Sequence, residues 1–281
     1  MIHTICICGA GTMGSGIAQV AAQNGFYTVL FDVNDAMLQK AQQNMQKNLQ
    51  LLADKKKISA EEQRQTLSRI QYVNDINFCI GEIIIEAVAE KKEVKIALFN
   101  QLAEVNHSET IFATNTSSLS VSKIAAGVMH PERVCGMHFF NPAPLMKLVE
   151  VVKAEQTRDD ILQSVYNLAL QMGKTPVICK DAPGFIVNRV ARHYYLESLK
   201  LAEEGIATYE QADAILEASG FKMGPFKLMD LIGNDVNLAV TQSLYEACGR
   251  PLRFRPSHIQ QQKVNAGELG KKTGRGYYNY Q

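Results

Sequence analysis

Short apolar runs alternate with helical stretches from the start of the chain to about Lys180. Runs rich in β-branched residues predict strands at HTICIC, YTVLF, EIIIEAV, TIFAT, VCGMHFF and KTPVIC. A further apolar run, LMKLVEVV, is expected to pair with VCGMHFF across the NPAP turn. Because strands alternate with helices, this part of the chain is predicted to form an α/β domain with a mostly parallel sheet and helices on its faces.

Helical patterns replace the strand signals after DAPGF. Gly205, Gly220 and Gly267 are placed where helices would end. The predicted helices are Phe185–Glu204, Tyr209–Ser219, Pro225–Ala247 and Pro256–Ala266. We therefore expect an α/β domain over residues 1–183 and an all-helical domain over residues 184–281.

A polar helical insertion is predicted between Asp35 and Arg69, with an interruption near Lys55 to Ser59. The segment is too polar for all of it to lie in a core. Two interpretations remain open, a solvated helical hairpin and a flap over a ligand.

Size and charge narrow the function classes. The 281 residues can hold two cores, and 29 Lys plus Arg balance 28 Asp plus Glu. A net charge near zero gives no general attraction to nucleic acid or to a membrane surface. The longest apolar runs, such as Ile83 to Ala89, are far shorter than the roughly 18 residues that cross a bilayer. A soluble protein is expected.

Cysteine usage and the start of the chain indicate the compartment. The six cysteines include no C-x-x-C pair and mostly lie in apolar runs, so we interpret them as core residues of a reducing compartment, with neither disulfides nor a metal site. A glycine loop that starts at Gly9 leaves no room for a targeting peptide unless one has been removed. A cytoplasmic location is expected.

The segment CGAGTMGSG carries G-x-G-x-x-G spacing at Gly9, Gly11 and Gly14, between a predicted strand and a helix that runs to about Asn24. These glycines, with Thr12 and Met13 in the same loop, would let the backbone approach a pyrophosphate at the helix N-terminus. The next predicted strand ends at Asp32, whose carboxylate would accept hydrogen bonds from the adenosine ribose. The alternative is a structural glycine turn with a solvent-facing Asp32. The full pattern favours a Rossmann-type domain, and because no arginine follows Asp32 directly, NAD is favoured over NADP.

Polar side chains also follow other predicted strands, and parallel sheets bind ligands at the carboxyl ends of their strands. The candidates for this crevice are Glu90 with Lys95, Asn115 to Ser117, and His138 with Asn141. Alternative roles are open for some of them. Ser117 and Ser118 could cap a helix around Val121 to Ala126, and Lys95 could be a solvated helix position.

His138 and Glu150 are two titratable groups in apolar strands. Next to a nicotinamide, a histidine can take the proton of a hydroxyl group while hydride leaves the same carbon. Pairing of the two strands would bring Glu150 within a residue or two of the position opposite His138, where it could orient the ring and stabilise the imidazolium. A core histidine with an edge-strand glutamate is the alternative.

Five motifs together resemble one known family. GAGTMGSGIAQ, NTSSLS, GMHFFNPAPLMKLVEV, DAPGFIVNR and KKTGRGYY are similar to the L-3-hydroxyacyl-CoA dehydrogenases, and more narrowly to the short bacterial 3-hydroxybutyryl-CoA dehydrogenases. The likeness spans essentially the whole chain. It implies NAD-dependent, reversible oxidation of the L-3-hydroxyl of a short-chain 3-hydroxyacyl-CoA, and a homodimer formed through the C-terminal domain.

The resemblance also implies site residues. His138 would be the general base and Glu150 its partner, while Ser117 and Asn188 would hydrogen-bond the substrate near the reacting oxygen and the thioester. Coenzyme A would lie at Asn48 and Lys55. The implied NAD contacts are Asp32, Glu90, Lys95, Ser117, Asn141 and Lys272.

Some questions stay open at this point. Asn234 stands where the family pattern predicts an apolar residue, which leaves the acyl-chain preference undecided. The same fold could also serve a dehydrogenase of a free hydroxy acid or sugar acid. Structural lens proteins that resemble the family are a non-enzymatic alternative.

Overall fold

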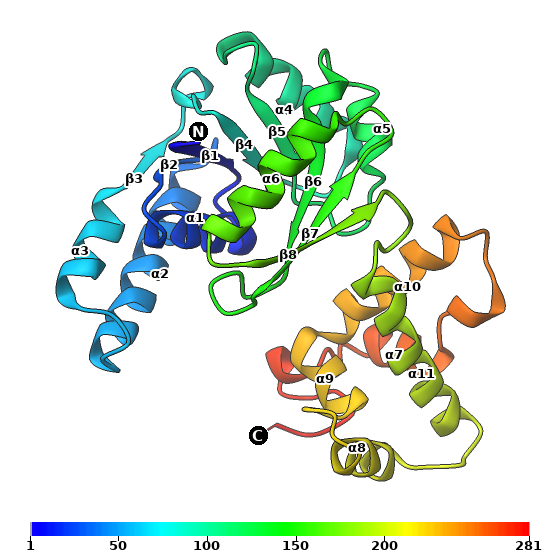
Figure 1. The fold of residues 1–281 in the computed structure, drawn as a ribbon. Helices are drawn as coiled ribbons and strands as arrows, with labels where there is room; N and C mark the ends of the chain where they lie inside the picture. Colours follow the sequence, from blue (N-terminus) through cyan, green and yellow to red (C-terminus); the bar gives the residue numbers. More distant parts are fainter. Residues whose placement is uncertain (1, 281) are drawn as a thin grey trace. The chain divides into compact units, whose positions relative to one another are not determined.

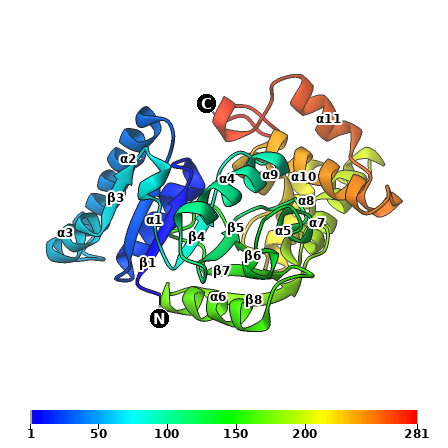
Figure 2. The same ribbon diagram turned by 90° about the horizontal axis from the view of Figure 1, so that it is seen from above.

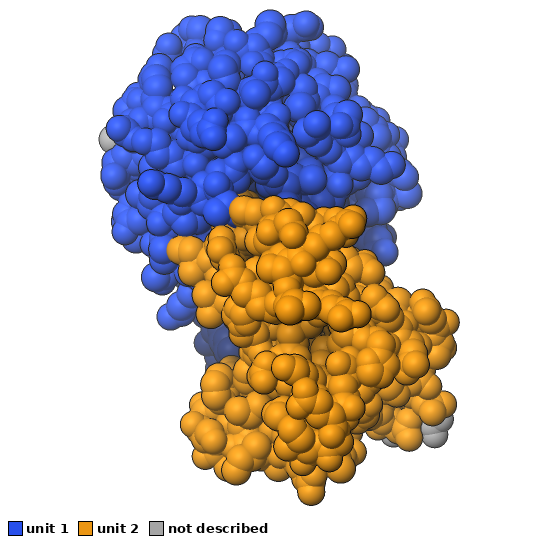
Figure 3. Space-filling model, turned by 90° about the vertical axis from the view of Figure 1, so that its right-hand side faces the viewer, with its two compact units in different colours: residues 1–182 blue, residues 183–281 orange. Residues whose placement is uncertain are grey.

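The computed structural model describes residues 2–280. The chain divides into two compact units, unit 1 from Met1 to Ala182 and unit 2 from Pro183 to Gln281, which Figure 3 shows in different colours.

Unit 1 is built on a sheet that has eight strands within the described residues, in the order β3-β2-β1-β4-β5-β6-β7-β8 (Figure 1). Every neighbouring pair is parallel except β6 and β7. The strands are β1 Thr4–Cys8, β2 Tyr27–Phe31, β3 Ile70–Val73, β4 Ile83–Glu86, β5 Ile111–Thr114, β6 Val134–Phe139, β7 Leu148–Lys153 and β8 Thr175–Lys180. The prediction of a mostly parallel α/β domain is confirmed.

Strand β3 was not predicted from the sequence. It follows the polar insertion directly and pairs only with β2, at the edge of the sheet. Its four residues include an exposed Gln71 and a half-buried Tyr72. An edge strand of this kind buries too little apolar surface to produce a strong strand signal in the sequence.

Helices cover both faces of the sheet (Figure 1, Figure 2). One core joins side chains of α1, α2 and α6 to the β1 positions Ile5 and Ile7. On the other face, Phe99 of α4 packs against Phe112 of β5 with their ring centroids 5.3 Å apart. The helices of unit 1 are α1 Thr12–Gln23, α2 Asp35–Asp54, α3 Ala60–Ser68, α4 Lys92–Val105, α5 Val121–Ala125 and α6 Asp159–Gln171, with short 3-10 turns η1 Ile76–Phe78 and η2 Pro131–Arg133.

The predicted helical insertion is confirmed as α2 and α3, and the break between them includes Lys55 to Ser59. Helix α3 begins at a capping box, in which Ser59 accepts a hydrogen bond from the Glu62 backbone N–H and Glu62 accepts one in return. The buried side chains of α2 recur every three or four residues, as expected of a helix that packs one face. They are Leu38, Ala41, Met45 and Leu49.

Unit 2 is helical, as predicted. Its core gathers Tyr195, Leu199, Phe226, Met229 and Tyr277. Its helices are α7 Val187–Glu203, α8 Tyr209–Ala218, α9 Pro225–Ile232, α10 Asn234–Ala247 and α11 His258–Asn265, with 3-10 turns η3 Leu252–Phe254 and η4 Lys271–Thr273. The helix bounds differ from the predicted ones by a residue or two, as fraying ends do.

The single helix predicted over Pro225–Ala247 is wrong, because Gly233 divides it into α9 and α10 with φ at +105°. Asn234, which follows the break, is fully buried. Its side-chain NH₂ donates to Asp230 Oδ1 at 2.9 Å and to the Glu268 carbonyl at 3.1 Å. Asn234 therefore has polar partners inside unit 2, which explains a polar residue where an apolar one was expected.

None of the helices within the described residues is long and apolar enough to span a membrane.

Candidate active site

The glycine loop joins β1 to α1, and at two of its glycines, Gly9 and Gly14, a side chain would not fit. Gly9 has φ at +106°, and a Cβ there would lie 2.6 Å from the Ala87 carbonyl oxygen. A Cβ on Gly14 would lie 1.7 Å from the Gly9 carbonyl oxygen, so loop and helix touch through their backbones. A Cβ on Gly11 would have no described atom within 4 Å. The loop therefore leaves open space at the N-terminus of α1, which fits the pyrophosphate of a dinucleotide.

Asp32 follows β2 and is tied to the glycine loop. Its Oδ2 accepts a hydrogen bond from the Ala10 backbone N–H at 2.8 Å, and its Oδ1 accepts one from the Asn34 backbone N–H at 3.0 Å. Each carboxylate oxygen keeps a lone pair for a further donor, such as a ribose hydroxyl. This position beside the loop fits the predicted cofactor contact better than it fits a solvent-facing carboxylate.

Lys95 is not a solvated lysine, so that alternative is wrong. Its side chain is 1% exposed, and its Nζ lies 2.6 Å from Glu86 Oε1 and 3.1 Å from Glu90 Oε2. Glu90 accepts further hydrogen bonds from the Ser117 backbone N–H at 3.2 Å, from the Ser118 hydroxyl at 3.0 Å and from the Thr116 hydroxyl. Burial acts to raise the pKa of Glu90, but Lys95 and the hydroxyl groups of Thr116 and Ser118 hold it below its usual range. The structure thus brings together Glu90, Lys95 and the segment after β5.

Glu86 is a member of this cluster that the sequence analysis missed. It ends β4 and is fully buried. Besides Lys95, its Oε1 accepts from the Val88 backbone N–H at 2.7 Å, and its Oε2 accepts from the Thr114 hydroxyl at 2.7 Å. The sequence signal that could have revealed it is a carboxylate directly after three isoleucines, Ile83 to Ile85, inside the predicted strand. Glu86 therefore fixes the ends of β4 and β5 where the cofactor crevice is expected.

Replacing Glu86 by Gln is expected to lower the free energy of unfolding by about 3 kcal/mol, because it removes the closer carboxylate partner of a buried ammonium. Urea unfolding followed by circular dichroism measures the change. Glu93→Gln is the control, since Glu93 lies in the first turn of α4 with its side chain 80% exposed. Equal stability of the two variants would show that Lys95 does not depend on Glu86.

The turn after β5 is not explained by helix capping through Ser117 or Ser118. The N-cap of α5 is Ser120, whose hydroxyl oxygen accepts a hydrogen bond from the Lys123 backbone N–H. Asn115 makes a contact with the next strand, because its Oδ1 accepts a hydrogen bond from the Phe139 backbone N–H at 2.8 Å. That bond ties the end of β5 to the strand that carries His138.

His138 on β6 and Glu150 on β7 lie directly opposite each other in the antiparallel pair. This confirms the predicted strand pairing, and the ring Nδ1 lies 2.7 Å from Glu150 Oε2. Both residues are at least 95% buried, and the Phe140 ring packs on the histidine with centroids 4.5 Å apart. Asn141 lies just beyond, in the exposed turn between the two strands.

The remaining predicted site residues lie on α2, at its C-cap, and in unit 2. Asn48 lies on α2 and Lys55 is its C-cap, and both side chains are exposed. The two residues are about two helical turns apart, so they lie near the same face of the helix. In unit 2, Asn188 is the second residue of α7, and Lys272 Nζ lies 2.6 and 2.7 Å from the two carboxylate oxygens of Asp235.

Comparison with known proteins identifies the family of this chain. A family model described as the NAD binding domain of 3-hydroxyacyl-CoA dehydrogenase matches residues 4–182, and one described as the C-terminal domain of 3-hydroxyacyl-CoA dehydrogenase matches residues 184–280. The 3-hydroxyadipyl-CoA dehydrogenase of Escherichia coli K12 is 47% identical over 281 residues, which cover 99% of this chain and 59% of that protein. The chain thus spans little more than half the length of that relative.

Two further matches cover nearly the whole of both proteins. The mitochondrial hydroxyacyl-coenzyme A dehydrogenase of Sus scrofa is 38% identical over 288 residues, which cover 100% of this chain and 92% of that protein. The crystal structure of (S)-3-hydroxybutyryl-CoA dehydrogenase from Ralstonia eutropha superposes with a TM-score of 0.96 at 37% identity and covers 100% of both chains. The chain therefore belongs to the 3-hydroxyacyl-CoA dehydrogenase family of NAD-dependent oxidoreductases.

Proposed function

We propose that this protein oxidises the L-3-hydroxyl group of a short-chain 3-hydroxyacyl-CoA to the 3-ketone, reversibly and with NAD. The observation that carries the proposal is the buried pair of His138 Nδ1 and Glu150 Oε2, 2.7 Å apart, on β6 and β7 of an NAD-binding fold. A carboxylate at Nδ1 favours the tautomer that carries its proton on Nδ1, and in that tautomer Nε2 is the nitrogen that can accept a proton.

His138 acts as the general base in the oxidation. Its Nε2 accepts the proton of the substrate hydroxyl group, and NAD supplies the acceptor for the hydride that leaves the same carbon. Glu150 stabilises the imidazolium that forms, and its effect is large because both groups are shielded from water. In the reducing direction the imidazolium returns the proton as an acid.

Other residues hold the substrate and the cofactor in this proposal. Ser117 and Asn188 hydrogen-bond the substrate near the reacting oxygen and the thioester, and Asn48 and Lys55 contact coenzyme A. The NAD contacts are the glycine loop with Thr12 and Met13, then Asp32, Glu90, Lys95, Asn115, Ser117, Asn141 and Lys272. Unit 2 is proposed to form a homodimer.

The acyl group is proposed to be short. Two relatives support this, since one is named a 3-hydroxyadipyl-CoA dehydrogenase and another a (S)-3-hydroxybutyryl-CoA dehydrogenase. NADH absorbance followed with 3-ketoacyl-CoA substrates of increasing length, and with 3-oxoadipyl-CoA, measures the preference. Turnover of a free 3-keto acid but of no CoA ester would replace the proposal by a dehydrogenase of free acids, and the absence of all turnover would favour a structural role.

Lys55→Glu is expected to raise the KM for acetoacetyl-CoA about five-fold and to leave kcat unchanged, because it replaces a cation beside the proposed coenzyme A phosphates by an anion. A solvated ion pair contributes up to about 1 kcal/mol, which corresponds to that factor. Lys40→Glu is the control, an exposed lysine nearer the start of the same helix. If both variants behaved alike, Lys55 would not contact coenzyme A.

A further inference from the structure

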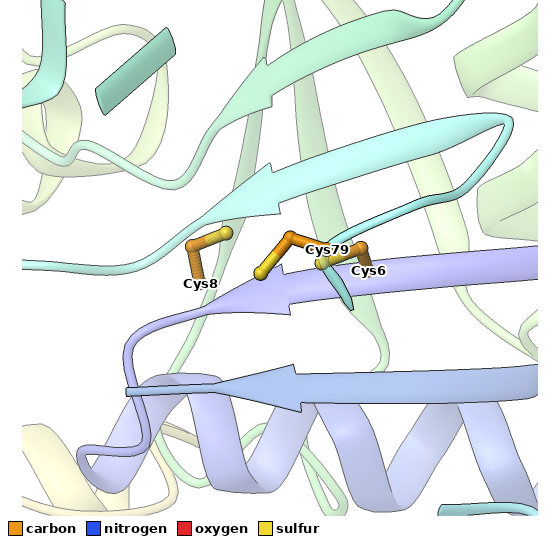
Figure 4. A group of neighbouring side chains, drawn as sticks. All are labelled: Cys6, Cys8 and Cys79. Atoms are coloured by element: carbon orange, nitrogen blue, oxygen red, sulfur yellow. The ribbon is translucent and has the colours of Figure 1, made fainter. Parts of the chain in front are cut away.

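Three cysteines converge in unit 1 on the face of β1 away from the glycine helix. Cys6 and Cys8 alternate along β1 with Ile5 and Ile7, whose side chains pack in the core with α1, so both thiols point to the opposite face of the sheet. Cys79, between η1 and β4, lies among them, and Figure 4 shows its side chain between those of Cys6 and Cys8. The three sulfur atoms all lie within 4.8 Å of one another.

The cluster is closed and its geometry is close to that of a metal site. All three cysteines are 0% exposed. One ion with three metal–sulfur bonds of about 2.3 Å in a plane holds its sulfur atoms about 4.0 Å apart, so a shift of less than about 1 Å would let one ion bind all three.

One polar contact of the cluster is made with its own segment. The Cys79 thiol donates a hydrogen bond to the Asp75 carbonyl oxygen, with 3.9 Å between the sulfur and oxygen atoms. Each thiol that bonds to an ion would release its proton to solvent.

We propose that Cys6, Cys8 and Cys79 form a binding site for one Cu(I) ion, held by three sulfur ligands. Soft thiolate ligands select Cu(I) and zinc over harder ions. Structural zinc almost always takes four protein ligands, and the group contains only these three His, Cys, Asp or Glu side chains within residues 2–280. Three sulfur ligands suit a three-coordinate monovalent ion.

The segment that carries Cys79 offers an entry route. Its neighbours Phe78 and Ile80 are 59% and 56% exposed, so the chain lies at the surface while the thiol points inward. The Cys79 carbonyl accepts a hydrogen bond from the Asn106 side chain at 2.7 Å, which holds the segment down. Local opening of this short segment would expose the cluster without unfolding the sheet.

The test is an anaerobic titration of the reduced protein with Cu(I) in competition with bicinchoninate, whose Cu(I) complex is coloured. The wild type is expected to take up one equivalent, and Cys79→Ala is expected to weaken that uptake by at least about 100-fold, more than the loss of an outer partner of a metal ligand costs. Cys135→Ala is the control, because Cys135 is buried on β6 in the core with α1 and α6. X-ray absorption of the loaded protein is expected to show three sulfur neighbours.

Failure to take up one equivalent, unchanged affinity in Cys79→Ala, or a number of sulfur neighbours other than three would each overturn the proposal. Circular dichroism verifies that the variants fold, and Cys79→Ser replaces Cys79→Ala if the latter does not. The number of sulfur neighbours is measured on the wild type, so it tests the proposal whether or not the Cys79 variants fold. None of these readouts depends on dehydrogenase turnover, so the copper site and the proposed function fail or hold separately.

Discussion

Replacing His138 by Gln is expected to lower kcat for the NADH-dependent reduction of acetoacetyl-CoA by about 10²–10⁴-fold, the usual contribution of a positioned acid or base. Gln has similar size and can still hydrogen-bond Glu150, but it cannot carry the proton to the forming hydroxyl group. The affinity for NADH, measured by its fluorescence, is expected to stay close to that of the wild type. The chemical step would then be the only one affected.

A second histidine provides the control for this experiment. His130 also lies near a carboxylate, with its Nδ1 3.5 Å from Glu132 Oε1, but both side chains are exposed. His130→Gln is therefore expected to leave kcat unchanged. Glu150→Gln is expected to lose less activity than His138→Gln and to keep its affinity for NADH, because it weakens the support of the imidazolium without removing the base. Equal turnover of His138→Gln and the wild type would eliminate His138 as the base.

Gly14→Ala is expected to disrupt the glycine loop, because the added Cβ would lie 1.7 Å from the Gly9 carbonyl oxygen. That contact is with backbone, so it can be relieved only by separating α1 from the end of β1. Forced contacts in a packed interior cost about 1–3 kcal/mol and occasionally more. We expect a loss of at least that size in the free energy of unfolding, measured in urea, together with loss of NADH binding.

Gly11→Ala separates the effect on NADH binding from the effect on stability. Its Cβ would have no described atom within 4 Å, and its backbone, with φ −67° and ψ −172°, is open to alanine. The variant is therefore expected to be about as stable as the wild type, within roughly 0.5 kcal/mol. Its affinity for NADH is still expected to fall, because the methyl group would occupy space proposed for the pyrophosphate. Unchanged NADH binding in Gly11→Ala would place the dinucleotide elsewhere.

Local patterns predicted most of the fold correctly. The parallel strands of the interior are continuous apolar runs, and the glycines at the helix ends have positive φ, as Gly205, Gly220 and Gly267 do. The predictions were wrong where a weak local signal met a tertiary contact. Strand β3 pairs on one edge only, and the break at Gly233 is stabilised by hydrogen bonds from Asn234 to Asp230 and to the distant Glu268.

The residues of the candidate site also fall into two groups, those that the sequence predicted and those that it did not. The glycine spacing and Asp32 could be recognised from the sequence because turn geometry and strand ends are encoded within about thirty residues. The burial of Lys95 could not, since its position on α4 is compatible with solvent until Glu86 and Glu90 are placed beside it. Glu86 has the local pattern of an ordinary strand-end carboxylate, and its burial beside Lys95 and Thr114 becomes visible only in the folded chain.

Local sequence patterns were enough to predict the α/β and helical halves, the glycine loop after β1 and the polar residues at the strand ends. The folded chain was needed to place His138 directly opposite Glu150, to bury Lys95 between two carboxylates and to bring Cys79 to Cys6 and Cys8. Periodicity and turn chemistry act between neighbours along the chain, whereas contacts between distant segments depend on strand register and helix packing. A shift of one residue between β6 and β7 would preserve both strands and separate His138 from Glu150.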